Sequence, residues 1–161
     1  MTLNARSEAV RRRLLRPWNF RLYLWARLPL AACAGLSLRR LDDTACTVAV
    51  PGGWRTRNPF RSMYFAAQSM AAEMSTGAPA MMLAEGASAS VSMLVREVRG
   101  VFTRRIQGEA EFTFEDLAGM RAAVERAVAS GESESFVAHS VGSTRDGAAS
   151  EFEITWSFKR R

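Results

Sequence analysis

One stretch of the sequence decides the fold: Asn58-Pro59-Phe60-Arg61-Ser62-Met63-Tyr64-Phe65-Ala66-Ala67-Gln68-Ser69-Met70-Ala71-Ala72-Glu73. It predicts a long and almost wholly apolar helix. Asn58 is a favourable N-cap residue, and Pro59 suits the first helical position, where its missing N–H costs nothing. Gly77 and Pro79 indicate the end of the helix. Apolar side chains cover most of its circumference, so we expect protein to surround it.

Glu73 is the one acidic residue of this predicted helix. Ser62, Ala66, Ser69 and Glu73 fall on a single narrow line at helical spacing. In one interpretation Glu73 reaches solvent or an arginine and has no chemical role, because glutamates are seldom fully buried without a partner. In the other, desolvation in the apolar seam raises the pKa of the Glu73 carboxyl, which then acts as a base or nucleophile.

The composition predicts one ordinary folded domain with a basic surface. The chain has 161 residues, 48% of them hydrophobic, and a formal net charge of +6. Lys159 is the only lysine, so arginine supplies almost all of the positive charge. A basic surface is either simply solvated or meets nucleic acid, an anionic membrane or substrate phosphates. We expect no nucleic-acid partner.

The cysteines and the hydropathy predict a reduced, cytoplasmic chain. Cys33 and Cys46 are isolated in apolar stretches, where a small hydrophobic residue would serve equally well. No convincing secretory signal is present. Arg27 and Pro29 divide the apolar region 22–38, so its runs are too short to span a membrane.

Common nucleophile and metal sites are not predicted. His139 is the only histidine, and no Gly-x-Ser-x-Gly turn accompanies it. The cysteines do not have the spacing of metal ligands. We therefore expect neither a metal ion nor another cofactor.

Periodicity elsewhere predicts an antiparallel sheet of about five or six strands with flanking helices. Helices are expected at 4–15, 17–34 and 115–129, and strands in 36–50, 88–101, 102–114, 136–141 and 152–158. A sheet interrupted early by one long apolar helix is an α+β design in which the sheet curls around that helix. We expect residues 1–35 to form a helical extension and residues 36–161 a single domain.

The order of these elements and the segment 58–73 resemble the hotdog fold of acyl-CoA thioesterases, in particular one bacterial hotdog family without an assigned activity. Its members show a similar Asn-Pro-Phe-x-Ser-x-Tyr-Phe run that leads to Ala-Ala-Glu-x-x-x-Gly. Ala71-Ala72-Glu73 and Gly77 match the second part. The resemblance covers the chain from about Leu36 to its end.

Resemblance to the phenylacetyl-CoA thioesterase branch implies roles for individual residues. In that branch an Asn is followed six positions later by His-Gly-Gly, and an acid follows eight or nine positions beyond. Backbone N–H groups at the glycines polarise the thioester carbonyl, and the carboxylate of the facing subunit attacks it or activates water. The implied catalytic residues are Glu73 and Asn58; the implied substrate contacts are Tyr64, Phe65, Ala66, Ser62 and Ser69; and the candidates for coenzyme A phosphates are Arg57, Arg104 and Arg105.

Three functions stay open at this point. The first is a thioesterase acting on acyl-coenzyme A or acyl-carrier protein, as a homodimer or a dimer of dimers. The second is a hotdog dimer that binds an acyl group without hydrolysing it, because Phe65 and Ala66 replace the two glycines. The third is a protein whose N-terminal helices contact a membrane surface.

Overall fold

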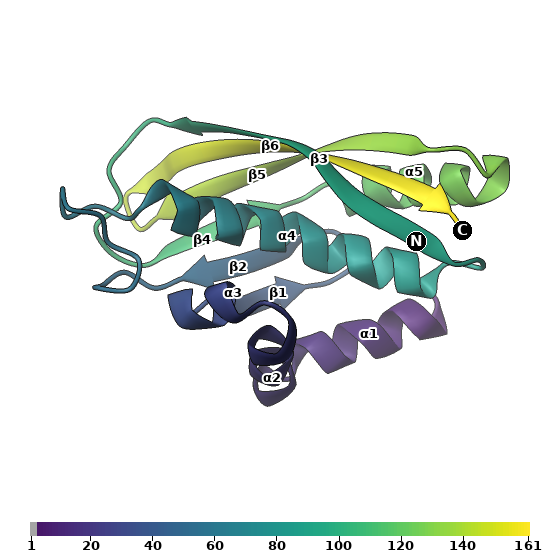
Figure 1. Cartoon of the computed structure of the whole chain (residues 1–161), viewed down its shortest axis with the longest axis horizontal. Coiled ribbons are helices and arrows are strands. Elements are labelled where there is room, and N and C mark those ends of the chain that lie inside the picture. The colour runs from purple at the N-terminus through teal and green to yellow at the C-terminus, as the bar shows by residue number, and fades with distance from the viewer. Residues whose placement is uncertain (1–2) are drawn as a thin grey trace.

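The computed structural model describes residues 3–161 and confirms the α+β architecture, with one antiparallel sheet curled around a long helix (Figure 1). The helices are α1 (Ala5–Leu15), α2 (Pro17–Arg27), α3 (Pro29–Ala34), α4 (Phe65–Gly86) and α5 (Leu117–Ser130). The strands are β1 (Ser37–Leu41), β2 (Cys46–Val50), β3 (Val91–Phe102), β4 (Ala110–Phe114), β5 (Glu134–Thr144) and β6 (Gly147–Arg160). None of the helices in residues 3–161 has both the length and the apolar character needed to cross a bilayer.

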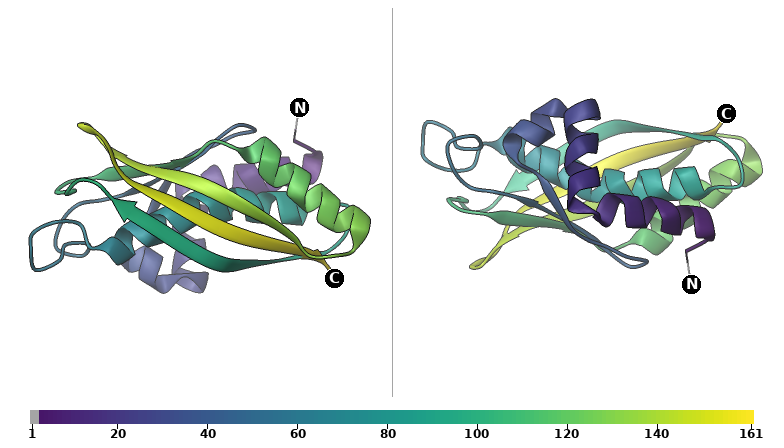
Figure 2. Two further views of the ribbon diagram at one scale, coloured as in Figure 1. Left: turned by 90° about the horizontal axis from the view of Figure 1, so that it is seen from above. Right: turned by 90° about the horizontal axis from the view of Figure 1, so that it is seen from below.

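The sheet has the strand order β1-β2-β4-β5-β6-β3, so β1 and β3 form its two edges. Its concave face covers one side of α4, and the helices of the N-terminal region cover the other, as the two views of Figure 2 show. The central helix is therefore enclosed by two layers, which explains how a segment with so few polar side chains can be helical.

Large side chains from the sheet and small ones from α4 form the core. The inward-facing residues of β4 and β6 are all buried: Phe112, Phe114, Phe152, Ile154, Trp156 and Phe158. This confirms the alternation predicted for the last strand. Alanines of α4 pack against the sheet and allow close approach. Burying each of the large side chains contributes about 1.5–3 kcal/mol before entropy is considered.

The start of the central helix was predicted wrongly, because α4 begins at Phe65 and not at Asn58-Pro59. Asn58 caps a turn instead, where its Oδ1 accepts hydrogen bonds from the backbone N–H groups of Phe60 at 3.0 Å and Ser62 at 3.1 Å. The backbone N–H of Tyr64 donates to the Thr56 carbonyl at 2.7 Å. These bonds hold the segment in a loop up to Tyr64, which is the N-cap.

The predicted end of this helix was also wrong, because α4 continues through Gly77 and Pro79 to Gly86. Pro79 removes the hydrogen bond that its N–H would give to the Ser75 carbonyl. Packing on both sides of the helix compensates for this loss, since Pro79 and its neighbours are buried. At Gly86 the helix meets α1 so closely that a Cβ would overlap the Ser7 hydroxyl.

The remaining elements follow the predicted order with different boundaries. The N-terminal region contains three helices where two were predicted, because Pro29 begins α3 after a break at Leu28. Of the predicted strand 102–114, Phe102 ends β3, residues 103–109 form a loop, and β4 begins at Ala110. Helices α1 and α2 place Val10, Leu14, Phe20 and Leu24 in the same core as the sheet. A domain boundary between residues 35 and 36 remains a prediction.

Candidate functional site

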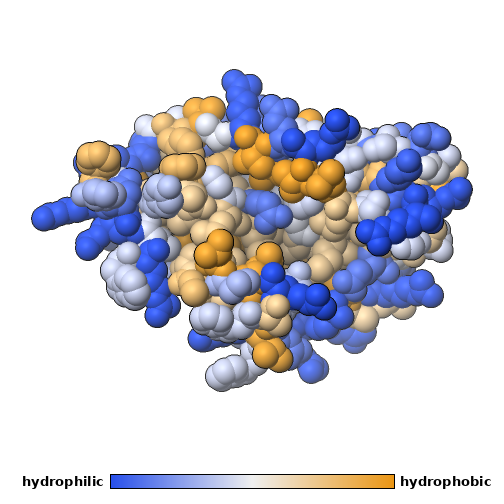
Figure 3. Space-filling model, viewed as in Figure 1, coloured by the Kyte–Doolittle hydropathy of each residue, from blue (hydrophilic) through white to orange (hydrophobic). Residues whose placement is uncertain are grey.

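Glu73 lies on the strip of α4 that the sheet and the N-terminal helices leave partly open. Ala66, Ser69, Glu73, Gly77 and Met81 follow one another along this strip at intervals of three or four residues, and each is partly exposed. Figure 3 shows this face, on which a mainly apolar surface over α4 is bordered by charged side chains. The carboxylate is therefore accessible while its surroundings are apolar.

Burial raises the pKa of the Glu73 carboxyl above its usual range. Within residues 3–161 this carboxyl makes no side-chain hydrogen bond and no ion pair. Burial also raises the pKa of Tyr23, and the negative charge of Glu73 raises it further. The interpretation in which an arginine neutralises Glu73 therefore has no support in the described chain.

Gly77 leaves the space that the Glu73 carboxylate and the indole ring of Trp156 share. A Cβ placed on Gly77 would lie 3.0 Å from Glu73 Oε1 and 3.3 Å from Trp156 Cζ2. Glycine in a helix interior costs about 1 kcal/mol relative to alanine. Its position one turn after Glu73 is explained by this close approach and not by a helix end.

Buried polar contacts fix α4 against the sheet next to Glu73. Trp156 Nε1 donates to Thr76 Oγ1 at 2.9 Å, and the Thr76 hydroxyl donates to the backbone carbonyl of Glu73 at 3.0 Å. The hydroxyl oxygens of Ser75 and Ser140 lie 2.8 Å apart. Sequence reasoning missed these positioning residues. The available signal was a pair of hydroxyl side chains in an otherwise apolar helix.

The first turn of α4 presents two backbone donors. Tyr64 provides no side-chain cap, and the N–H groups of Phe65 and Ala66 make no hydrogen bond within residues 3–161. A helix N-terminus also carries a partial positive charge that stabilises negative charge nearby. The Phe65 ring packs edge-on with Phe102 at the end of β3, with 6.5 Å between ring centroids. These two N–H groups match the positions that the resemblance assigned to thioester binding.

The other predicted polar residues are arranged around this turn. Asn58 Oδ1 accepts hydrogen bonds from the Ser62 N–H and hydroxyl, so Ser62 lies in the loop and not on the helical seam, which corrects the predicted line. Ser69 does lie on α4, where its hydroxyl donates to the Phe65 carbonyl at 3.0 Å. Asn58 therefore shapes the loop that leads to the free N–H groups.

The three arginines proposed for phosphate binding are exposed, and they contact different parts of the chain. The Arg105 side chain donates to the Phe60 carbonyl, and the backbone of Arg57 forms an isolated antiparallel β-bridge with that of Met63. Both residues therefore border the loop before α4. Arg104 Nε donates to the Ala148 carbonyl at 2.9 Å, at the start of β6. Only the first two are held to the loop that precedes the helix start.

Gln68 is a buried polar residue that sequence reasoning did not select. It lies in the first turn of α4, and its Nε2 donates to the Met63 carbonyl at 3.3 Å. Its Oε1 has no hydrogen-bond partner in the part of the chain that the structure describes. An amide within an alanine-rich helix was the signal that could have identified it.

Glu73 and the helix-start donors are too far apart to act on one atom within a single chain. Phe65 and Glu73 are eight residues apart on α4, which corresponds to about 12 Å along a helix axis. The described residues contain no group of three or more His, Cys, Asp or Glu side chains placed to hold a metal ion. The site therefore consists of one carboxylate and, at a distance, one pair of N–H donors.

Comparison with solved structures identifies the fold. A Pseudomonas aeruginosa protein described as a probable thioesterase is 18% identical, with a TM-score of 0.73 over 90% of this chain and 97% of its own. The chain has the hotdog fold. A mutant thioesterase from Pseudomonas aeruginosa is 17% identical, with a TM-score of 0.66 over 88% of this chain and 94% of its own. A Haemophilus influenzae thioesterase is 9% identical, with a TM-score of 0.61 over 86% of this chain and 88% of its own.

Comparison of sequences adds no closer relationship to the hotdog assignment. No protein-family model matches the chain, and no curated protein matches it. Identities this low establish the fold alone.

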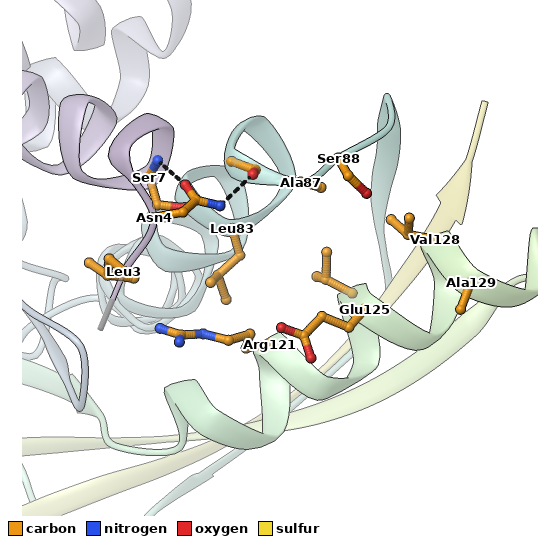
Figure 4. Close-up of a pocket in the computed structure, with 12 residues that line it drawn as sticks. Leu3, Asn4, Ser7, Leu83, Ala87, Ser88, Arg121, Glu125, Val128 and Ala129 are labelled. Atoms are coloured by element: carbon orange, nitrogen blue, oxygen red, sulfur yellow. Dashed lines mark hydrogen bonds between the residues drawn. The ribbon is translucent and has the colours of Figure 1, made fainter. Parts of the chain in front are cut away.

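The hotdog domain also has a cavity of about 390 Å³ at the C-terminal end of α4, between the start of α1 and α5. Figure 4 shows that Asn4 bonds there to the Ser7 N–H and to the Gly86 carbonyl. Glu73 does not line this cavity. Its nearby polar contacts join helix ends, so we do not assign the candidate site to it.

Proposed function

We propose that the protein is a thioesterase that hydrolyses acyl thioesters of coenzyme A or of acyl-carrier protein. One observation carries the proposal: Glu73 is a partly buried carboxylate with a raised pKa and no cationic partner in residues 3–161, on the central helix of a hotdog fold. A carboxyl group whose pKa is raised toward neutrality suits general base catalysis.

In the proposed reaction the Glu73 carboxylate takes a proton from a water molecule, whose oxygen attacks the thioester carbonyl carbon. The carbonyl oxygen becomes an oxyanion, which the free N–H groups of Phe65 and Ala66 stabilise. The C–S bond then breaks, and protonated Glu73 returns the proton to the departing thiolate. The products are a carboxylic acid and a free thiol, so atoms and charge balance.

These groups are separated by about 12 Å of helix rise, so we propose that they come from two chains of a homodimer that forms through β3. This strand is an edge of the sheet, twelve residues long, with exposed apolar side chains at Leu94, Val98 and Val101. Antiparallel pairing with β3 of a second copy would cover the β3 edge of each copy. A two-fold axis there would set the α4 helices antiparallel, which turns the helix start of one chain toward Glu73 of the other.

A complementation experiment tests the shared site. Glu73→Gln removes the base, and Asn58→Ala removes the side chain that shapes the donor loop. We expect Glu73→Gln to abolish hydrolysis of a panel of acyl-coenzyme A thioesters and Asn58→Ala to reduce it roughly a hundredfold to a thousandfold. Coexpression of the two variants should restore about a quarter of the wild-type rate, because mixed dimers contain one intact site.

Absence of this recovery would place both residues in one chain's site or remove one of them from the mechanism.

The arginines near the helix start provide a second test. We propose that Arg57 and Arg105 contact the phosphates of coenzyme A, whereas the Arg104 side chain is bound to the Ala148 carbonyl. Their replacement by glutamine should raise KM for acyl-coenzyme A and leave turnover of a short thioester without the nucleotide unchanged.

A non-catalytic acyl-binding dimer is the second candidate. Tyr64 and Phe65 are about half exposed at the helix start, where the phenylacetyl-CoA thioesterases that the sequence resembles have His-Gly-Gly. This bulk limits the space for a thioester against the backbone, so any hydrolysis should be slow. Tight binding of an acyl-coenzyme A by the wild type without product formation would support this candidate over the thioesterase.

A further inference from the structure

Helix α2 has two apolar faces, and only one of them enters the core. Phe20 and Leu24 point inward and are 3% and 1% exposed. On the other face, Trp18, Leu22 and Trp25 are 81%, 71% and 56% exposed. Their spacing of four and three residues places them in one row. Leu30 at the start of α3 is also 76% exposed, and these four residues form what we name the outer stripe.

The charged residues that flank the outer stripe in the sequence are all basic. Residues 9–41 contain eight arginines and no aspartate or glutamate. Arg16, Arg21 and Arg27, which belong to α2 or precede it, form no ion pair with any residue in 3–161. The carboxylate of Glu85, which lines a cavity with Leu22 and Arg27, is paired with Arg13. Large apolar side chains with an excess of positive charge match an anionic, apolar surface.

A second basic and aromatic element lies beside the stripe. Arg55 and Trp25 line a common cavity of about 500 Å³, together with Arg21. The Arg21 guanidinium lies 5.8 Å from the ring centre of Trp18, and that of Arg55 lies 5.5 Å from the ring centre of Trp54. Trp54 is 80% exposed. Two positive charges thus lie over exposed indole rings.

We propose that the outer stripe is a docking surface for an anionic lipid bilayer. Indole rings favour the boundary between acyl chains and headgroups, and arginines beside them can bind lipid phosphates. Helix α2, which carries three of the four residues of the outer stripe, lies on the side of the molecule away from β3, β5 and β6 (Figure 1). A row of large apolar side chains that are this exposed fits a fluid lipid surface, into which such residues can insert.

Vesicle co-sedimentation tests this proposal independently of any enzymatic activity. The full chain is mixed with phosphatidylcholine vesicles that contain either no anionic lipid or about a third phosphatidylglycerol. We expect binding to the anionic vesicles only, and weaker binding as salt is raised. The combined change Trp18→Ala, Leu22→Ala and Trp25→Ala should lower the partition coefficient at least about tenfold. The control Val137→Ala and Val141→Ala removes exposed apolar groups from β5 and should have no effect.

A charge variant keeps the test decisive if the apolar variant does not fold. Arg16→Gln, Arg21→Gln and Arg27→Gln should weaken binding strongly, whereas Arg99→Gln, Arg145→Gln and Arg161→Gln remove equal charge elsewhere and should weaken it much less. Failure of the wild type to bind anionic vesicles would overturn the proposal. Equal loss from both charge variants would also overturn it. A stripe variant that only changes the oligomeric state would instead identify the stripe as a contact between copies.

Discussion

The indole Nε1 of Trp156 donates a hydrogen bond to Thr76 Oγ1 at 2.9 Å, and this bond joins β6 to α4 three residues after Glu73. The same hydroxyl donates to the backbone carbonyl of Glu73. The sheet therefore holds the segment of helix that carries the carboxylate. Small changes at this contact should affect both stability and the position of Glu73.

Trp156→Phe should destabilise the fold by about 1–2 kcal/mol, because it removes a buried hydrogen bond and part of a large ring. We expect the loss in urea denaturation, together with reduced turnover. The same hydrogen bond can be tested from the other side with Thr76→Val, which removes the hydroxyl that accepts from the indole, and Thr76→Ser, which retains it. Thr76→Ser should preserve stability and turnover better than Thr76→Val. Equal behaviour of the two threonine variants would show that the hydroxyl does not matter.

Gly77→Ala should reduce turnover without the stabilisation that alanine usually brings to a helix. The helix preference for alanine, about 1 kcal/mol, should be offset by the close approach of the new Cβ to Glu73 Oε1 and Trp156 Cζ2. Steady-state kinetics and thermal unfolding measure the two effects. A more stable variant with unchanged kinetics would show that Gly77 serves only the local backbone.

Glu73→Gln should stabilise the protein near neutral pH. Burial raises the pKa of this carboxyl in the folded state above its unfolded value, so the folded chain binds the proton more tightly. Stability is then greatest below the unfolded pKa and falls as pH rises through the window between the two values. The variant escapes this loss. Its melting temperature should exceed that of the wild type by about 2–4 °C per kcal/mol relieved.

The matched control for this change is Glu85→Gln on the same helix. Glu85 forms an exposed ion pair with Arg13 at 3.1 Å, and such pairs contribute little. We expect no stabilisation from this variant at neutral pH. The advantage of Glu73→Gln should disappear in acid, where the wild-type carboxyl is protonated. An advantage that persists in acid would have a cause other than charge burial.

Hydrolysis should depend on the ionised form of Glu73. Whether it acts as base or nucleophile, kcat/KM should rise with pH through the raised pKa of the Glu73 carboxyl and then reach a plateau. This rise in kcat/KM should occur at a higher pH than the pKa range of an exposed glutamate. A rate that does not change across the acidic range would separate catalysis from this carboxyl.

Local sequence signals predicted the elements of the sheet better than the limits of the central helix. Alternation along 152–158 is a strong signal, because every second side chain enters the core. Asn58-Pro59 is an equally good signal for a helix start, yet long-range bonds override it. The Met63 N–H donates to the Ile106 carbonyl at 2.7 Å, and no local pattern reveals that contact.

The candidate site could be predicted in part for similar reasons. Glu73 is identifiable because a carboxylate in an apolar helix is unusual, and its raised pKa agrees with that expectation. Trp156 reaches α4 from a strand eighty residues away from Thr76, so its contribution depends on the tertiary fold. Ser62 was wrongly assigned to the helix because the helix was predicted to start too early in the sequence, whereas Ser62 lies in the preceding loop.

Asn4 connects two helices, α1 and α4, that are far apart in the sequence and are therefore synthesised at different times. Its Oδ1 accepts from the Ser7 N–H at the start of α1, and its Nδ2 donates to the Gly86 carbonyl at the end of α4, 82 residues later. During synthesis α1 emerges long before this carbonyl exists, and long-range contacts of this kind form slowly. The start of α1 therefore gains this contact only after the central helix has formed, and its amides should be among the last to acquire protection from hydrogen exchange.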